Sequence, residues 1–320
     1  MGSGSYLPER ILTNEDLEHL VDTSDEWIVE RTGIRQRRMV GAGETTSTMA
    51  VRAAEAACQE AGIDPADIDL IVVATITPDM VFPSTACLVQ EAIGAHKAGA
   101  FDLSAACSGF LYALATGASF IRSRMAKRVL VIGSETMSKV VDYQDRTTCI
   151  LFGDGAGAVL LGPSSNGNGL IYSQLRADGR GASLMSIPAG GSLLPASRET
   201  VADRLHFMKF RGREVFKFAV NAMKELVEEA MRCCELSPDQ VGLVVPHQVN
   251  ERIIEAAMKK LNLPREKYYV NIDRYGNTSA ASVPIALDEA RRGGRIKQGD
   301  HVIMVAFGGG LTWASSVLRM

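Results

Sequence analysis

A cysteine, a histidine and an asparagine occupy positions in this chain from which side chains can do chemistry. Cys107 follows the short segment 101–103 and begins an apolar helical stretch rich in small residues. His247 follows the apolar run 243–245, and Asn277 lies in a glycine turn before another helical stretch. Backbone N–H groups at a helix N-terminus favour a thiolate, so we expect a lowered pKa and a nucleophilic thiol at Cys107. A neutral histidine and an asparagine add two hydrogen-bond donors for an oxyanion.

The cysteine and the histidine each also have a structural alternative. A buried cysteine most often serves as a small apolar side chain, and a lone histidine is more often structural than catalytic. We apply the structural interpretation to the remaining histidines, which are His19, His96, His206 and His301. The six cysteines are too few and too irregularly spaced for a disulfide framework, and none forms a C-x-x-C pair, so no metal site is expected.

The elements that would position these residues follow from an internal repeat. An amphipathic stretch at 47–61 precedes a turn containing proline and then the continuous apolar run 70–73. The stretch 221–234 precedes the same kind of turn and the run 243–245. Each copy is typical of a helix, a turn and a fully buried strand. The two copies lie 173 positions apart, so the chain contains a structural duplication.

Further strands repeat in the same order. The offset of 173 also pairs the apolar runs 129–132 and 302–305. Segments 101–103 and 271–273 are predicted as short strands whose register differs by a few residues. Two α/β units of matching order predict a pseudo-duplicated α/β fold with helices covering each sheet. Ligands collect at strand ends in such sheets, so we expect one shared crevice there.

Composition excludes several classes of protein. The chain has 320 residues, of which 46% are apolar, which is enough for a core in each of two units. The formal net charge of −3 argues against a nucleic-acid partner. We find no signal-peptide pattern and no apolar run long enough to cross a bilayer, so we expect a cytoplasmic protein without a membrane partner.

From Gly4 to the C-terminus the sequence closely resembles β-ketoacyl-acyl carrier protein synthase III, the initiating condensing enzyme of bacterial type II fatty-acid synthesis. The resemblance rests on the blocks Thr23–Ile28, Arg31–Ile34, Phe152–Ala158, Pro246–Gln248, Gly276–Ser282 and Phe307–Gly310. It implies a thiolase-like layered αβαβα fold built from two pseudo-duplicated halves. Residues 1–165 would carry the nucleophilic cysteine, and residues 166–320 would carry the histidine and the asparagine.

The resemblance also implies a reaction. Cys107 would accept an acyl group from acetyl-coenzyme A or a short acyl-coenzyme A. His247 and Asn277 would then stabilise the enolate that forms when malonyl-acyl carrier protein loses carbon dioxide, giving acetoacetyl-acyl carrier protein. The backbone N–H groups of Cys107 and Gly309 would form the oxyanion hole for acyl transfer. Neutral donors suit a decarboxylation because they do not stabilise the departing carboxylate.

Within the thiolase superfamily that the resemblance implies, Asn277 narrows the choice of subfamily. At this third catalytic position, elongating synthases have a second histidine and degradative thiolases have a second cysteine. Initiating synthases and chalcone-synthase-like relatives remain. The alternatives are therefore a related secondary-metabolism ketosynthase or acyltransferase and, in a different class, a non-catalytic scaffold.

The two glycine-rich segments suggest no nucleotide site: Gly153–Ala158 precedes a predicted strand and not a helix, and Phe307–Gly310 lacks the lysine of a phosphate loop.

Binding residues follow from the resemblance as well. Coenzyme A would be held by Trp27, Arg31, Arg146 and Asn250. An acidic acyl carrier protein, which brings its phosphopantetheine arm, would dock on Lys217, Arg252 and Lys259. Surface ion pairs and solvated helix faces are the alternatives for these basic residues, and they suit Arg204 and Lys260 as well.

Phe82 and Cys87 match a loop and an acyl pocket that this family builds across a two-fold interface. We therefore expect a homodimer in which the loop closes the partner's pocket. An ordinary turn is the alternative for the loop. No cofactor would be bound permanently, because coenzyme A enters as part of the acyl substrate and phosphopantetheine arrives on the carrier.

Overall fold

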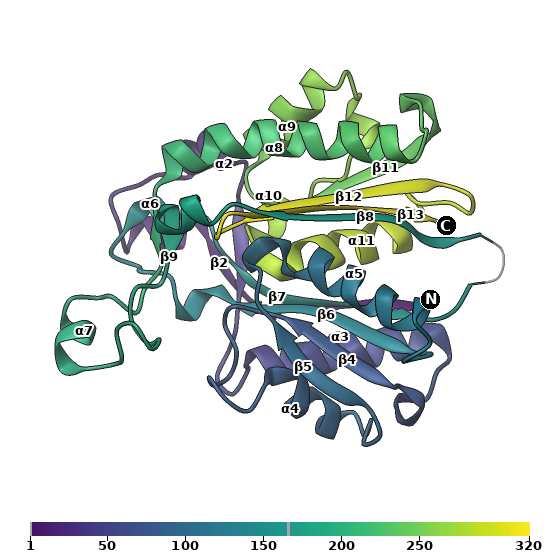
Figure 1. Ribbon diagram of the computed structural model, residues 1–320. Helices are drawn as coiled ribbons and strands as arrows, with labels where there is room; N and C mark the ends of the chain where they lie inside the picture. Colours follow the sequence, from purple (N-terminus) through teal and green to yellow (C-terminus); the bar gives the residue numbers. More distant parts are fainter. Residues whose placement is uncertain (1, 165–166) are drawn as a thin grey trace.

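The structure is a computed structural model that describes residues 2–164 and 167–320, except for the side chains of Arg213 and Lys217. Two β-sheets alternate with three layers of helices (Figure 1). The first sheet consists of β1 (Gly2–Tyr6), β7 (Asp154–Leu161), β6 (Val129–Thr136), β4 (Leu70–Ala74) and β5 (Gly99–Leu103), in that order. The second consists of β11 (Val241–Pro246), β12 (His301–Gly308), β13 (Thr312–Arg319) and β8 (Gly169–Ala177).

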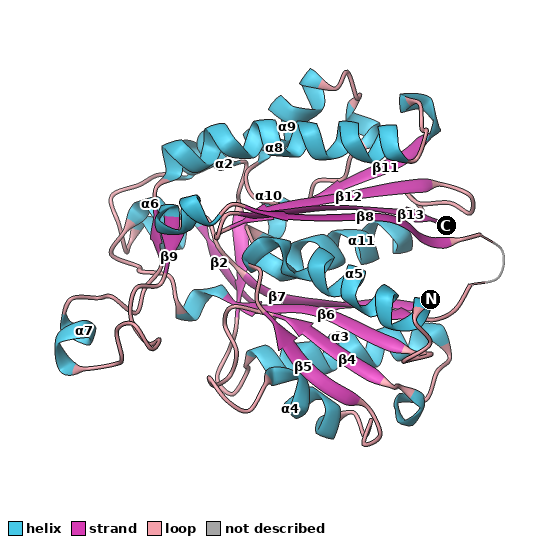
Figure 2. Ribbon diagram, viewed as in Figure 1, coloured by secondary structure: helices cyan, strands magenta, loops and turns pink. Residues whose placement is uncertain are grey.

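Figure 2 separates the helices from the sheets by colour. The helices are α1 (Asn14–Glu18), α2 (Asp25–Thr32), α3 (Thr46–Ala61), α4 (Thr85–Ala92), α5 (Gly109–Arg122), α6 (Arg146–Cys149), α7 (Arg198–Ala202), α8 (Gly212–Cys233), α9 (Glu251–Lys260), α10 (Ile272–Tyr275) and α11 (Ser282–Arg292). Helices α5 and α11 lie between the sheets, α3 and α4 cover the first sheet, and α8 and α9 cover the second. The predicted αβαβα layering is confirmed.

Shorter elements connect these layers. Two small antiparallel ladders join β2 (Arg10–Thr13) to β3 (Gln36–Met39) and β9 (Met185–Ser186) to β10 (Lys209–Phe210). The 3-10 turns are η1 (Pro65–Asp67), η2 (Ala106–Ser108), η3 (Met137–Lys139), η4 (Gly179–Leu184), η5 (Pro238–Gln240), η6 (Arg265–Lys267) and η7 (Ser279–Ala281). Turns η1 and η5 are the two copies of the predicted turn, since each contains its proline and leads into a buried strand.

Four strands of each sheet have the same pattern, as the repeat predicts, and the first sheet adds a fifth strand, β5, parallel to β4. In each sheet two neighbouring strands are parallel, namely β4 with β6 and β11 with β12. An antiparallel strand follows in each, β7 or β13, and a further antiparallel strand, β1 or β8, forms the edge. The first sheet takes its strands from residues before 162 and the second from residues after 168. The predicted boundary at residues 165 and 166 lies outside the described residues.

The strands are continuously apolar because both faces of each sheet are covered. Successive side chains of a strand point to opposite faces. Ile71 therefore packs in the core under α3 and α4, whereas Val72 packs in the core between the sheets. Ile303 packs under α8 and α9, and its neighbour Val302 joins the central core. One core thus lies under α3 and α4, one between the two sheets, and one under α8 and α9.

One predicted strand is wrong. The segment 271–273 lies at the start of α10, and the chain there makes only an isolated parallel bridge between Val244 and Tyr268. The reason is a side chain that competes with a strand ladder: the N–H of Asn271 donates to Gln248 Oε1 at 2.9 Å. The chain then turns back toward the central layer, which carries Asn277 to the ends of the strands. Segment 101–103, by contrast, belongs to β5 as predicted.

Candidate active site

Cys107 lies in η2, immediately before α5, at the end of the central layer that faces β12. Only 5% of the residue is exposed. Its place directly before the first turn of α5 is the one that the sequence predicted. Ala106, the preceding residue, has a φ of 47°, in the left-handed region that non-glycine residues seldom adopt, so the turn that presents the thiol is strained.

The structure brings the three predicted catalytic residues together. Cys107, His247 and Asn277 line one cavity of about 530 Å³. They arrive there from η2, from the end of β11 and from the turn after α10. The cavity continues outward past Trp27 and Arg252. Nucleophile and donors from both sheets therefore share one space that opens toward basic residues.

His247 is fully buried, and its two ring nitrogens have different surroundings. Nδ1 lies 2.9 Å from Ser282 Oγ, and that oxygen accepts the N–H of Gln248 at 2.8 Å. Ser282 can therefore donate its own hydrogen to Nδ1, which leaves the hydrogen of the neutral ring on Nε2. Nε2 has no protein partner among the described residues. The imidazole thus offers one N–H donor to a molecule in the cavity.

Asn277 is held in a similar way. Its Oδ1 accepts the N–H of Ser279 at 2.9 Å, so the orientation of the amide is fixed. No described residue is a hydrogen-bond partner of its Nδ2, which leaves the NH₂ group as a donor for the cavity. The backbone of Asn277 is itself tied to Leu151 O at 2.8 Å. His247 and Asn277 are therefore two neutral, preoriented donors, which suits them to a developing oxyanion.

Burial sets the protonation of the site. It lowers the pKa of His247 to about 3, so the imidazole is neutral throughout the physiological range. It also raises the pKa of Cys107 to about 12, although the side chain of Ser279 acts to lower that pKa. The expected lowering of the Cys107 pKa is therefore wrong. Burial is the largest influence on the thiol pKa, so at neutral pH Cys107 is a thiol and His247 is a neutral imidazole.

Close backbone approach encloses Cys107. A Cβ added at Gly308 would lie 2.6 Å from the backbone nitrogen of Cys107, so only glycine fits there. Gly308 lines the cavity, whereas the predicted oxyanion-hole residue Gly309 packs against Met185. On the other side, a Cβ at Gly133 would lie 2.3 Å from Ala280 O, so glycine lets η7 pack directly onto β6. Both glycines bring segments distant in sequence to the thiol.

The predicted coenzyme A residues form a stack at the cavity mouth. The guanidinium carbons of Arg31 and Arg146 lie 4.7 and 5.2 Å from the ring centroid of Trp27. Arg146 also forms an exposed ion pair with Asp22 at 3.4 Å, which is the alternative predicted for surface arginines. Planar aromatic and guanidinium groups of this kind stack on a purine base.

A buried cation fixes the wall that carries Arg146. Arg37 on β3 is fully buried and donates to Ile150 O at 2.8 Å and to Asn14 Oδ1 at 2.9 Å. Ile150 ends α6, so this bond satisfies a carbonyl at a helix C-terminus, where positive charge is favourable. Burial lowers the pKa of Arg37 to about 10, which leaves it charged at neutral pH.

Asn250 lines the cavity, but both ends of its amide already have partners. Oδ1 accepts the N–H of Arg252 at 2.9 Å and so caps α9. Nδ2 donates to Arg31 O at 2.9 Å, which links α9 to α2. A contact between Asn250 and coenzyme A would have to replace or share one of these bonds.

The predicted carrier-docking residues lie around the same mouth. Arg252 lines the cavity, and Lys259 lies two turns further along α9, on the same face of the helix. Both side chains are exposed. Lys217 belongs to α8, but its side chain lies outside the described residues. Arg204 is instead bonded to Asp142, with Nε 2.9 Å from Oδ2, so the ion-pair alternative holds for that arginine.

Phe82 and Cys87 do not line the cavity that contains Cys107. Phe82 is 84% exposed and its neighbour Val81 is 93% exposed. Cys87 is exposed on α4, where its thiol accepts the hydroxyl of Ser84 at 3.2 Å. An acyl pocket that includes Phe82 cannot therefore be formed by this chain around its own thiol.

For three polar residues near the site, no role was predicted from the sequence. Glu135 is the second-last residue of β6, Ser279 lies in η7, and Ser282 begins α11. A signal for the serines existed, since both belong to the block Gly276–Ser282 that contains Asn277. The signal for Glu135 was weaker: it is an acidic residue three positions after the apolar run 129–132.

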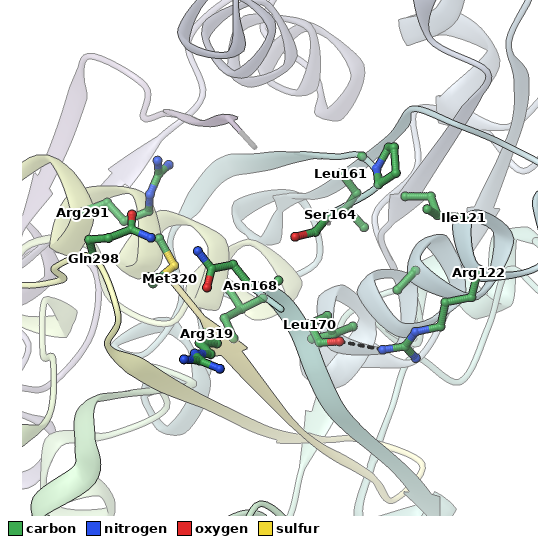
Figure 3. A pocket seen from close by; sticks show the side chains of 15 residues that line it. Ile121, Arg122, Leu161, Ser164, Asn168, Leu170, Arg291, Gln298, Arg319 and Met320 are labelled. Carbon is green, nitrogen blue, oxygen red and sulfur yellow. Dashed lines mark hydrogen bonds between the residues drawn. The ribbon is translucent and has the colours of Figure 1, made fainter. Parts of the chain in front are cut away.

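Another cavity, of about 630 Å³, lies at the far end of α5 and contains none of the predicted site residues (Figure 3). Arg122, at the C-terminal end of α5, donates there to Leu170 O at 2.6 Å. The described residues contain no cluster of metal-ligating side chains. They also contain no helix that is both long and apolar enough to span a bilayer.

Comparisons with known proteins identify the family of this chain. Residues 101–179 match the family 3-oxoacyl-[acyl-carrier-protein (ACP)] synthase III, and residues 231–320 match its C-terminal family. The beta-ketoacyl-[acyl-carrier-protein] synthase III of Caldanaerobacter subterraneus is 55% identical over 319 residues, which cover 100% of this chain and 96% of that protein.

Two solved structures are similar throughout. The crystal structure of 3-oxoacyl-[acyl-carrier-protein] synthase III from Aquifex aeolicus has a TM-score of 0.92 and 49% identity, with coverage of 100% of this chain and 98% of that one. The priming beta-ketosynthase from the R1128 polyketide biosynthetic pathway has the same TM-score at 37% identity, with coverage of 100% and 95%. The chain has the thiolase-like fold and belongs to the β-ketoacyl-[acyl-carrier-protein] synthase III family of acyl-transferring condensing enzymes.

Proposed function

We propose that this protein carries out the initiating condensation of fatty-acid synthesis, with acetyl-coenzyme A or another short acyl-coenzyme A as primer and malonyl-acyl carrier protein as extender. The observation that carries the proposal is the convergence of Cys107, His247 and Asn277 on one cavity. The R1128 priming ketosynthase has a lower identity, 37%, than the synthase III of Caldanaerobacter, 55%, which favours the fatty-acid role over secondary metabolism.

In the first half-reaction the adenine of coenzyme A stacks on the Arg31–Trp27–Arg146 group, and its acyl thioester reaches Cys107. The Cys107 sulfur attacks the carbonyl, the thioester bond to coenzyme A breaks, and the acyl group stays on Cys107. We assign the backbone N–H groups of Cys107 and Gly309 to the oxyanion of this step. The free coenzyme A thiol then leaves by the same mouth.

In the second half-reaction the malonyl thioester places its carbonyl oxygen between His247 Nε2 and Asn277 Nδ2. Loss of carbon dioxide leaves an enolate whose negative oxygen both donors stabilise. Phe307 packs edge-on against the imidazole, with ring centroids 5.8 Å apart, and makes this part of the cavity apolar. An apolar wall disfavours the charged carboxylate and favours its departure. The enolate carbon then attacks the acyl group on Cys107.

Intact mass spectrometry after incubation with acetyl-coenzyme A alone tests the first step. We expect one acetyl group per chain, mapped to the peptide containing Cys107. Adding malonyl-acyl carrier protein to the acetylated protein should release the acetyl group as acetoacetyl-acyl carrier protein. Extension of malonyl-coenzyme A but not of malonyl-acyl carrier protein would contradict the fatty-acid role, and the absence of any acyl adduct would contradict the proposed chemistry.

Carrier docking gives a separate prediction. Arg252→Ala is expected to raise the KM for malonyl-acyl carrier protein by about two- to fivefold, which is the effect of losing one exposed ionic contact. The rate of Cys107 acetylation should not change, because the acetyl donor is not the carrier. The difference from wild type should shrink at high salt, where screening removes the contact in both proteins.

Arg232→Ala is the matched control for Arg252→Ala. Arg232 is also an exposed arginine, but it lies in the last turn of α8, at the opposite end from the cavity residue Gly212. We expect an unchanged KM for the carrier in this variant. Equal carrier requirements in both variants and wild type would exclude Arg252 from the docking surface.

We also propose a homodimer in the cytoplasm. The exposed Val81 and Phe82 precede α4, which packs against β5, an edge strand of the first sheet, and an exposed apolar loop near an open edge favours association. A second chain would bring its Phe82 toward the pocket of Cys107. Sedimentation of the protein as a monomer at micromolar concentration would contradict the dimer, and recovery with membranes on fractionation would contradict the location.

A further inference from the structure

The chemistry at Cys107 leaves one proton unassigned. The thiol must lose its proton as the sulfur attacks, yet burial holds the pKa of His247 at about 3, so this imidazole is a poor proton acceptor. Asn277 is a donor and not a base. A group that can take the proton must therefore lie elsewhere against the sulfur.

Glu135 is a buried carboxylate close to this sulfur. It is fully buried at the end of β6, and burial raises its pKa. Its Oε2 accepts hydrogen bonds from the segment that follows β4, including Thr77 Oγ1 at 2.6 Å and Thr75 Oγ1 at 3.1 Å. Among the residues that the structure describes, its Oε1 accepts only the hydroxyl of Ser279, at 2.9 Å. None of the ion pairs among the described residues involves Glu135, so no cation fixes its charge.

Ser279 connects Glu135 to the sulfur. Turn η7, which contains Ser279, packs against η2, which contains Cys107. The hydroxyl of Ser279 donates to Glu135, and the Ser279 side chain also lowers the pKa of the Cys107 thiol against which its turn packs. A hydroxyl has one hydrogen to donate and accepts through its lone pairs. While Ser279 donates to the carboxylate it can accept the S–H of Cys107, and it can also do the reverse.

We propose that Glu135 takes up the proton of Cys107 through the hydroxyl of Ser279 during acyl transfer. The S–H bond of Cys107 breaks as its proton moves to Ser279 Oγ. The original O–H bond of Ser279 breaks as the hydroxyl proton moves to Glu135 Oε1. The sulfur then forms its new bond to the acyl carbon. Total charge in the buried site is unchanged until the acyl donor's thiolate leaves. Reversal of the relay then returns the proton through Ser279 to that thiolate. This inference rests on the proposed function of Cys107.

The relay predicts an unusual pH dependence of thiol reactivity. With Glu135 as acceptor, the reactive state of the pair contains the same number of protons as its resting state, so the rate stays flat through neutral pH. Glu135→Gln removes the acceptor, and the proton must then go to solvent. In this variant the rate should rise tenfold per pH unit and fall by about 100-fold at pH 7. Ser279→Ala should behave in the same way, because it breaks the connection but keeps the backbone N–H that orients Asn277.

Alkylation of Cys107 by iodoacetamide, followed by peptide mass spectrometry, measures this dependence without any acyl donor. The matched control is Asp154→Asn, since Asp154 is also a fully buried carboxylate held by hydrogen bonds from Val40 and Ser138. We expect a flat profile in the control. Flat profiles in Glu135→Gln or Ser279→Ala, or a wild-type rate that itself rises tenfold per pH unit, would overturn the relay.

Two further readouts separate a relay from a structural role and from failure of the proposed function. Decarboxylation of malonyl-acyl carrier protein should be unchanged in Ser279→Ala, since it uses His247 and Asn277 and not the thiol proton. Its loss would mean that Ser279 only maintains the shape of the site. Absence of acetylation in the wild-type protein would count against the proposed function, whereas the alkylation profiles would still decide the relay.

Discussion

Cys107→Ala is expected to abolish acetylation by acetyl-coenzyme A and to reduce condensation by about 10⁴-fold or more, as loss of a nucleophile does in other covalent mechanisms. Decarboxylation of malonyl-acyl carrier protein should continue, because its donors come from other elements: His247 from the end of β11 and Asn277 from the turn after α10. Intact mass measures the first effect, and carbon dioxide release measures the second.

The matched control is Cys58→Ala. Cys58 is likewise a buried cysteine whose pKa burial raises, but it packs in the core under α3 and does not line the cavity. This variant should be acetylated once, at Cys107, at the wild-type rate. An acetyl group on Cys107→Ala would show that another residue is the nucleophile, and a simultaneous loss of decarboxylation would contradict the division of labour between the two halves of the site.

The layers could be predicted from the sequence because burial on both faces gives the strands a distinctive composition. Runs such as 70–73 and 302–305 contain no polar residue, and apolar runs this short, bounded by turns, are typical of fully buried strands. Segment 271–273 has no such run. Its structure depends on the side chain of Gln248, which lies 23 residues before Asn271, so nothing local could have shown that it begins a helix.

The convergence of the three proposed catalytic residues on one cavity could be predicted, but their protonation could not. The types and places of Cys107, His247 and Asn277 follow from strand ends and a recognisable set of blocks. The pKa of Cys107 depends on how tightly Gly308 and η7 close over the sulfur, which is a property of tertiary packing. Glu135 could not be predicted for the same reason, since its partners Thr77 and Ser279 come from both sheets' connections and meet only in the folded chain.

His247→Ala and Asn277→Ala are expected to lower the rate of decarboxylation by about 10²- to 10³-fold each, which is the effect of removing one preoriented donor from an oxyanion. Acetylation of Cys107 should persist in both variants, because neither residue accepts the thiol proton in the proposed relay. The double variant should lose less than the product of the two effects, since both donors act on one oxygen. Carbon dioxide release from malonyl-acyl carrier protein measures all three.

A matched control and a pH profile make this prediction specific to a neutral donor. His301→Ala removes a histidine at the start of β12, the end opposite to Gly308, and should leave decarboxylation unchanged. In the wild-type protein the rate should not fall as the pH is lowered through about 6.5, the usual pKa of histidine. The imidazole is already neutral there and remains so until pH approaches its pKa of about 3. A rate that halves near the usual histidine pKa would contradict a neutral Nε2–H donor, because it requires titration of an exposed imidazole. A normal rate in His247→Ala would also contradict it, because the enolate would then be stabilised by Asn277 alone.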